Sequence, residues 1–155
     1  MKNLVFVCLF FISSLHSQDL FLHCGKIIDT ENGKTLNNKT IIVSGNKILS
    51  IKNGFISPDN PDNKVINLKN KTVMPGFIDM HVHLESQFDP KKGRLNVTAN
   101  DADVAFESIE YAKKTLMAGF TTVRDLGGRG VNISLRNAIN QGKVIGPRVF
   151  TAGKS

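Results

Sequence analysis

The second half of the sequence alternates between strand-like and helix-like segments, and this order restricts the fold more than any other feature. Uninterrupted apolar or β-branched stretches predict strands, whereas apolar residues at helical spacing, followed by a glycine, predict helices. Strands that alternate with helices form parallel β/α units with right-handed crossovers. In chain order we expect a strand at 77–84, a helix from Asn100 or Asp101 to Gly119, a strand at 120–126, a helix at 133–140 and a strand at 148–152.

Three β/α strands are too few to close a barrel, whose complete form takes about 250 residues. The sequence has 155 residues, and it stops directly after the third of these strands, without a helix to cover it. We therefore expect an α/β fold that is incomplete in this chain.

The region before Pro75-Gly76 has a different pattern. Short apolar pieces are separated by Asn, Gly, Asp and Pro, which is typical of short antiparallel strands. Gly45-Asn46 lies between two of these pieces and predicts a tight hairpin, because glycine can adopt the positive φ that such a turn requires. The predicted strands are at 26–28, 40–43, 47–51 and 65–68.

The first residues have the order of a secretory signal peptide. Lys2 is followed by an uncharged apolar run at 4–12 and then by small residues up to Ser17. The run is shorter than the roughly 20 apolar residues that span a bilayer. We predict that residues 1–17 are removed on export, which would place the protein in the periplasm or outside the cell with no stable membrane anchor. A buried N-terminal strand or a retained anchor is the alternative.

Export would leave one thiol and a basic protein. Cys8 lies in the predicted signal peptide, so we expect Cys24 to be a free, partly buried cysteine. The formal net charge is +7, but the Lys and Arg residues are scattered and not interleaved with aromatic residues as stacking platforms. We therefore expect a solvated surface and no nucleic-acid partner.

The strongest chemical signal is the pair His81 and His83. Alternate residues of a strand point to the same face, so both imidazoles project together at the carboxyl end of the first β/α strand. Barrel enzymes place their active sites at this end, and two neutral imidazoles can bind one divalent ion. Asp79 lies on the same face, where it could orient an imidazole or, alternatively, fix the loop backbone as a buried hydrogen-bonding residue. Val82 and Ile78 are expected to face the helices.

Arg124 and Asp125 end the next strand and could contact a substrate at the same end of the sheet. An ion pair, or a cap for the turn at Gly127-Gly128, is an equally good interpretation of these two residues. The spacing of the glycines in this turn fits neither a P-loop nor a dinucleotide-binding fingerprint. We therefore exclude nucleotide binding.

Several separated motifs resemble the amidohydrolase superfamily, and in particular its imidazolonepropionase-like and prolidase-like branch. The segment at 73–83, Val-Met-Pro-Gly-Phe-Ile-Asp-Met-His-Val-His, resembles the signature of the superfamily. The segments that resemble the small β-sandwich before the barrel are at 25–29 and 41–48, and those that resemble the branch are at 118–128 and 146–149.

This resemblance implies a domain organisation. Residues 18–73 would supply the N-terminal strands of a composite β-sandwich domain, and residues 74–155 the first three β/α units of a truncated (β/α)8 TIM barrel. The complete enzyme could form a homo-oligomer.

The resemblance also implies a metal-dependent hydrolase, in which the metal activates a water for attack on an amide or related carbon. His81 and His83 match the first-strand metal ligands of the family. The other family ligands come from later strands: a carboxylated Lys or Glu, two further His, and an Asp that is also the general base. No His follows His83, so we identify no catalytic residue in this chain and expect the general base downstream. The expected cofactor is zinc, as one or two ions, because imidazole suits it.

We expect the complete enzyme to hydrolyse C–N bonds of small molecules, with dipeptides of the Xaa-Pro type as the leading substrates because export favours scavenged peptides. A cyclic-amide hydrolase of the imidazolonepropionase kind is the alternative within enzymes. The alternative of a different class is a non-catalytic, truncated product that binds metal weakly through its His pair. On either reading, the 155-residue chain alone is expected to be inactive.

Overall fold

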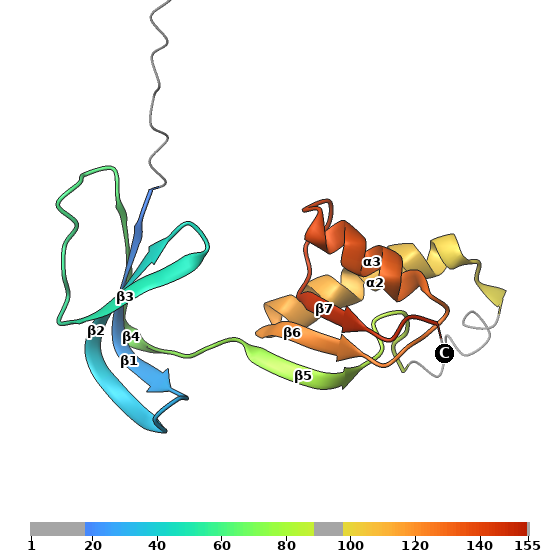
Figure 1. Cartoon of the computed structure of the whole chain (residues 1–155), viewed down its shortest axis with the longest axis horizontal. Coiled ribbons are helices and arrows are strands. Elements are labelled where there is room, and N and C mark those ends of the chain that lie inside the picture. The colour runs from blue at the N-terminus through green and yellow to red at the C-terminus, as the bar shows by residue number, and fades with distance from the viewer. Residues whose placement is uncertain (1–17, 89–97, 155) are drawn as a thin grey trace, which may run out of the picture. The chain divides into compact units, whose positions relative to one another are not determined.

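A computed structural model of the chain describes residues 18–88 and 98–154, which form a mixed α/β structure (Figure 1). The chain divides into two compact units, with the boundary between Pro75 and Gly76. The predicted signal peptide and its cleavage point lie outside the described residues.

The first unit is a four-stranded sheet with the strand order β3-β2-β1-β4. Neighbouring pairs β1–β2 and β2–β3 are antiparallel, and Ser44 pairs with Lys47 across the predicted hairpin, where Gly45 has a φ of +57°. The hairpin prediction is therefore confirmed. The strands are longer than their apolar pieces, because polar residues continue the ladders: β1 is Leu20–Asp29, β2 Lys34–Ser44, β3 Lys47–Asn53 and β4 Lys64–Val73.

The expectation of purely antiparallel strands is wrong for β4, which pairs with β1 in parallel. The reason is the connection at 54–63, which carries the chain from β3 at one edge of the sheet to β4 at the other. Parallel neighbours require such a crossover, whereas a tight turn can only join antiparallel strands.

The β1–β4 ladder contains an irregularity that only glycine fits. The register shifts between Cys24 and Lys26, and Gly25 lies at the shift. A Cβ added at Gly25 would lie 1.9 Å from the carbonyl oxygen of Lys69. The two strands approach so closely here that the site excludes any side chain.

The core of the first unit contains Cys24, Ile27 and Ile41. Cys24 is a free cysteine, as predicted, and it is fully rather than partly buried. Burial raises the pKa of its thiol, with a smaller opposing effect from a backbone hydrogen bond at Ile41. A buried thiol that stays protonated is a poor nucleophile.

The second unit is a parallel three-stranded sheet in the order β5-β6-β7, with both described helices on one face (Figure 1). The predicted order of strands and helices is confirmed, and the ends differ from the prediction by at most a few residues. The elements are β5 Phe77–Val82, α2 Asp101–Met117, β6 Phe120–Asp125, α3 Val131–Asn140 and β7 Arg148–Thr151.

Helix α2 begins where the sequence predicts it. The side chain of Asn100 accepts hydrogen bonds from the N–H groups of Ala102 and Asp103, and the Asp103 carboxylate accepts one from the N–H of Asn100. This reciprocal capping box satisfies N–H groups that the first helical turn leaves unpaired. Gly119, with a φ of +99°, follows the helix end.

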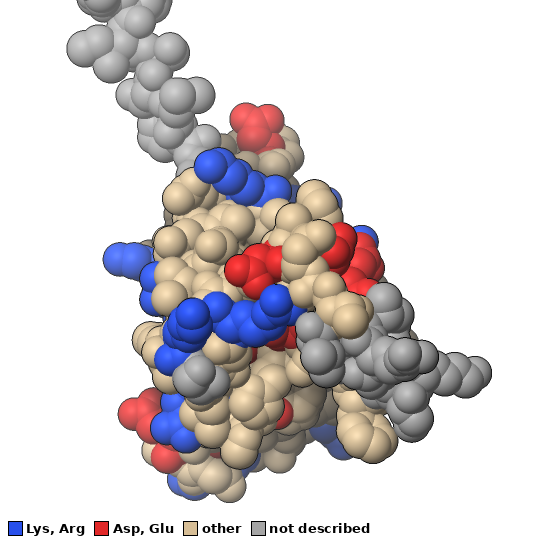
Figure 2. Space-filling view, turned by 90° about the vertical axis from the view of Figure 1, so that its right-hand side faces the viewer, with Lys and Arg blue, Asp and Glu red and all other residues tan. Residues whose placement is uncertain are grey.

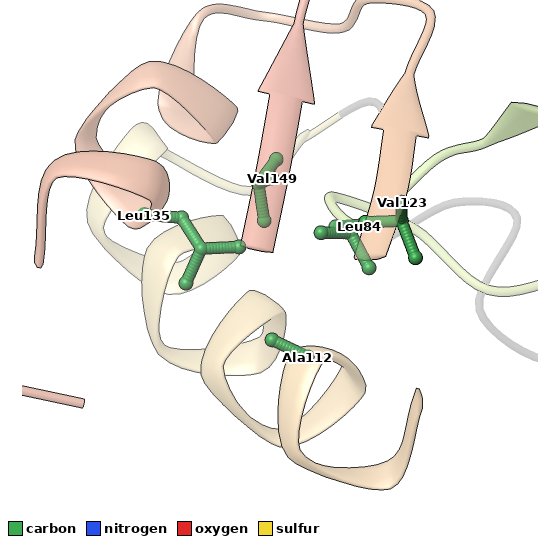
Figure 3. Packing of buried hydrophobic residues seen from close by; sticks show 5 residues of the cluster. All are labelled: Leu84, Ala112, Val123, Leu135 and Val149. Carbon is green, nitrogen blue, oxygen red and sulfur yellow. The ribbon is translucent and has the colours of Figure 1, made fainter. Parts of the chain in front are cut away.

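The core of the second unit lies between the helices and the sheet. Figure 3 shows side chains from α2, α3, β6, β7 and the segment after β5 converging on this space. Val82 packs against this cluster as predicted, but Ile78 is 62% exposed. The prediction that Ile78 packs beneath the helices like Val82 is wrong: at the edge strand β5, Val82 near the carboxyl end reaches the core, whereas Ile78 near the start of the strand stays exposed. The buried members are Leu84, Ala112, Val123, Leu135 and Val149.

The face shown in Figure 2 carries Lys and Arg side chains together with Asp and Glu side chains. Positive charge is thus interspersed with negative charge on this face, as the scattered sequence positions suggest. Among residues 18–88 and 98–154, no helix has the length and apolar character needed to cross a bilayer.

Candidate metal centre

His81 lies on the face of the second sheet that is opposite to the helices. Val82 packs against the core beneath the helices, and strand alternation directs the preceding side chain to the other face. Both His81 and His83 are exposed, and their ring centroids are 5.5 Å apart with an angle of 71° between the rings. The structure therefore places the two predicted ligands next to each other, and their binding of one ion stays a prediction.

A backbone carbonyl fixes the tautomer of His83. Its Nδ1 lies 3.1 Å from the carbonyl oxygen of Gly127. Because a carbonyl only accepts hydrogen bonds, Nδ1 carries the proton and donates it, and Nε2 of the neutral ring keeps a free lone pair. Metal-binding histidines commonly use their second nitrogen in this way. Nε2 is thus the atom that His83 can offer to an ion.

Asp79 stabilises the strand backbone. Its Oδ1 accepts a hydrogen bond of 3.0 Å from the N–H of His81, and the residue is half-buried. The contact is to backbone, as in the second interpretation of Asp79, but it lies within β5 rather than in the loop, and the residue is only half-buried. A role in orienting an imidazole stays a prediction.

Arg124 and Asp125 have different environments although they are neighbours. Arg124 is exposed, and its Nε donates to the carbonyl oxygen of Met80 at 2.8 Å. Asp125 is fully buried, and its carboxylate accepts hydrogen bonds from the N–H of Leu84 at 2.8 Å and the N–H of Gly127 at 3.0 Å. Asp125 therefore caps the glycine turn, as one of the two interpretations stated. Substrate contact by Arg124 stays a prediction.

Two further residues complete this region, and the sequence reasoning missed both. The Glu85 carboxylate accepts hydrogen bonds from the N–H groups of Arg129 at 2.5 Å, Gly130 at 3.2 Å and Asn132 at 2.7 Å. Asn132 is fully buried, and its Nδ2 donates to Asp125 Oδ1 at 2.9 Å. One signal was available: Gly130 is the N-cap of α3 and has no side chain to cap it, so the acceptor had to come from elsewhere in the chain.

The residues present fit a metal in donor chemistry, and they would supply part of its coordination. Two imidazoles suit zinc and other divalent transition metals. Within 18–88 and 98–154, no group of three or more His, Cys, Asp or Glu side chains is arranged to hold a metal ion. The pair supplies two donors, and further donors would have to come from water or from other residues.

The sequence matches the model of the Amidohydrolase family over residues 72–155. A curated relative, an adenine deaminase of Staphylothermus marinus, is 31% identical over 135 residues, which cover 79% of this chain and 19% of that protein. An ochratoxinase of Aspergillus niger is 29% identical over 82 residues, covering 52% of this chain and 17% of that protein.

Two solved structures are similar over almost all of the described chain. One is a Xaa-Pro dipeptidase with bound methionine in its active site, with 40% identity and a TM-score of 0.81 over 89% of this chain and 34% of that chain. The other is a prolidase complexed with N-methylphosphonate-L-proline, with 34% identity and a TM-score of 0.75 over 89% of this chain and 32% of that chain. The chain thus spans about a third of the length of these solved relatives.

Proposed function

Because the chain belongs to the amidohydrolase family, we propose that it forms the first part of the active site of a metal-dependent hydrolase that acts on C–N bonds of small molecules. The observation that carries this proposal is the exposed pair of imidazoles at the carboxyl end of the parallel strand β5, with the Nδ1 proton of His83 donated to the Gly127 carbonyl. In this proposal His81 and His83 are the first two metal ligands.

We assign the second unit to the first three β/α units of a TIM barrel, and the first unit to the N-terminal strands of a β-sandwich. The parallel order β5-β6-β7 with both helices on one face supports the barrel assignment. The face opposite the helices would then be the barrel interior. His81 and Arg124 lie on that face, at the carboxyl end where barrel enzymes place their chemistry.

For the substrate, we propose dipeptides of the Xaa-Pro type. Support comes from the two solved relatives at 40% and 34% identity, which are a Xaa-Pro dipeptidase and a prolidase. Hydrolysis of a cyclic amide is the second candidate, and it is favoured less because the similarity to a dihydroorotase of Anaeromyxobacter dehalogenans covers only 68 residues.

The residues of this chain would prepare the site. When bound, a divalent ion, for which we propose zinc, lowers the pKa of a water and polarises the amide carbonyl. His81 and His83 would hold that ion, while the Gly127 carbonyl keeps the proton of His83 on Nδ1. The Asp79 carboxylate accepts a hydrogen bond from the N–H of His81. This contact would limit the movement of the His81 backbone and so of the ligand that it carries.

Zinc binding by the purified chain tests this proposal. His81→Ala and His83→Ala should each lower the affinity by about tenfold or more, since even the loss of an outer partner of a ligand costs about 10–100-fold. Titration calorimetry or competition with a chromogenic chelator measures the affinity. His23→Gln is the matched control, because it removes an imidazole of the first unit while keeping a donor for the Ile56 carbonyl. Equal affinity in the double His81/His83 variant and the parent chain would contradict the proposal.

We also propose export, directed by residues 1–17. The exported protein should begin near Gln18, which N-terminal sequencing of the periplasmic or secreted fraction determines. The control is a chain with Leu4→Arg and Phe6→Arg, which break the apolar run and should keep the protein inside the cell. Recovery of Met1 on a cytoplasmic form of the unaltered chain would rule out this localisation.

A further inference from the structure

Three consecutive residues after β5 are each bonded to the turn that leads from β6 into α3. The His83 ring donates to the Gly127 carbonyl, the Leu84 N–H donates to Asp125 at 2.8 Å, and Glu85 accepts from the start of α3. These partners lie 41 to 47 residues further along the chain. The exit of β5 is therefore held against the entry of α3 by a continuous set of contacts.

Within this set, Glu85 makes the only hydrogen bonds that join an ionised side chain to the N-terminus of a helix. Its carboxylate meets the N–H groups of Arg129, Gly130 and Asn132 at the N-terminus of the ten-residue helix α3. Hydrogen bonds to an ionised acceptor are stronger than neutral ones, and the partial positive charge of a helix N-terminus favours a carboxylate. Glu85 supplies the cap that Gly130 lacks.

The turn has room for the Glu85 carboxylate because residue 128 is glycine, which has no side chain. A Cβ at Gly128 would lie 2.4 Å from Oε2 and 2.5 Å from Cδ of Glu85. Any other residue at this position would force the carboxylate to shift from its present position. On its other side the segment is anchored by Arg129, whose guanidinium pairs with Asp101 at 3.2 Å and donates to the Ala99 carbonyl at 2.8 Å.

The contacts continue from Glu85 to the end of β7. Asn132, whose N–H donates to Glu85, is fully buried and donates through Nδ2 to both Asp125 Oδ1 and the Gly153 carbonyl, at 2.9 and 3.1 Å. The carboxyl ends of all three parallel strands are thus joined through Glu85, Asp125 and Asn132.

We propose that Glu85 is a positioning residue for the metal site: by holding the exit of β5 against the entry of α3, it keeps the His83 ring on the Gly127 carbonyl and so presents Nε2 to the ion. This inference rests on the proposed function, since it assumes that His83 is a ligand. Without the Glu85 contacts, the segment two residues from His83 is released, and the ring loses the constraint that keeps its proton on Nδ1. A ring with its proton on Nε2 cannot bind the ion through that atom.

A double-mutant cycle between Glu85 and Gly128 tests the proposal. Glu85→Ala removes the carboxylate, and Gly128→Ala displaces it by steric conflict, so each variant should lower zinc affinity by about tenfold, the scale of losing an outer partner of a ligand. The combined variant should bind no more weakly than Glu85→Ala, because the added Cβ then has nothing to displace. Glu85→Gln keeps one acceptor oxygen and should restore part of the affinity. Glu110→Ala, at an exposed position of α2, is the matched control and should bind as the parent does.

The second readout is the tautomer of His83, observed through its side-chain nitrogen chemical shifts without metal. The parent should show a ring protonated on Nδ1, and Glu85→Ala and Gly128→Ala should show a mixture of tautomers. If Glu85→Ala does not fold, Gly128→Ala and Glu85→Gln decide the question by the same two measurements. A folded variant with unchanged zinc affinity and an unchanged His83 tautomer would overturn the proposal, as would additive losses in the double-mutant cycle. If the parent binds no zinc, the proposed function fails, and the tautomer alone decides whether Glu85 positions His83.

Discussion

Replacement of Asp125 by alanine is expected to lower the free energy of unfolding of the second unit by about 4 kcal/mol, because it leaves three donors without an acceptor at roughly 1–3 kcal/mol each. The donors are the N–H groups of Leu84 and Gly127 and the side-chain amide of Asn132. Asp125 has no exposed surface, so water cannot readily replace the carboxylate. Tyr111 lies in α2 and is the only tyrosine of a chain without tryptophan, so its fluorescence during urea unfolding reports on this unit.

Two variants make this measurement specific. Asp101→Ala removes a carboxylate that is 70% exposed and pairs with Arg129, and it should change stability little, as exposed ion pairs usually do. Asp125→Asn keeps one acceptor oxygen but turns an amide group toward a donor, so its loss should lie between those of the other two variants. If Asp125→Ala proved as stable as Asp101→Ala, the three donors would have found other partners, and the capping role assigned to Asp125 would be wrong.

The second large effect is expected in the first unit, where Gly25→Ala should cost about 3 kcal/mol, at the upper end of the usual range for overpacking. The added Cβ would meet the backbone carbonyl of Lys69 at 1.9 Å, and a backbone atom cannot rotate away as a flexible side chain does. Relief requires the β1 and β4 strands to separate at the register shift. The adjacent Cys24 is fully buried, so the rate at which it reacts with a thiol reagent measures this opening.

Gly33→Ala provides the comparison for the strand variant. Gly33 has a φ of +63° but no atom within 4 Å of an added Cβ, so alanine there should cost only the left-handed backbone conformation, about 1 kcal/mol. Cys24 should therefore be protected almost as well in Gly33→Ala as in the parent chain. Similar labelling rates in both glycine variants would mean that the strands accommodate a side chain at Gly25.

The features that the sequence predicted are those encoded by neighbouring residues. The helix start at Asn100 depends on a capping residue and its partner three positions later, and the hairpin at Gly45 depends on one glycine between two strands. The nearness of the His81 and His83 rings was predicted from strand alternation, which the structure continues almost to His83, one residue past β5. In each case the cause lies within a few residues of the effect.

The features that the sequence reasoning missed depend on residues that are far apart in the chain. Glu85 caps a helix that begins 46 residues later, and β4 pairs in parallel with β1 after a crossover. Ile78 is exposed because of its place at the edge of a sheet, although its apolar character and alternation are those of a buried residue. No local pattern distinguishes these outcomes, because each depends on which distant element becomes the neighbour.

The burial of Asn132 has a practical consequence for producing the protein. Asn132-Ile133-Ser134 has the sequence of an acceptor for N-linked glycosylation, yet in the folded unit the Asn132 amide is inside the protein and donates two hydrogen bonds. A sugar could be attached there only before α3 docks, and it would then prevent the first turn of that helix from docking at all. In a host that glycosylates nascent chains during translocation, docking of this helix would compete with glycosylation of Asn132. Chains that are glycosylated at Asn132 would then be unable to reach the folded state. Expression in a host without that machinery, or with Ser134→Ala to remove the acceptor sequence, avoids this competition.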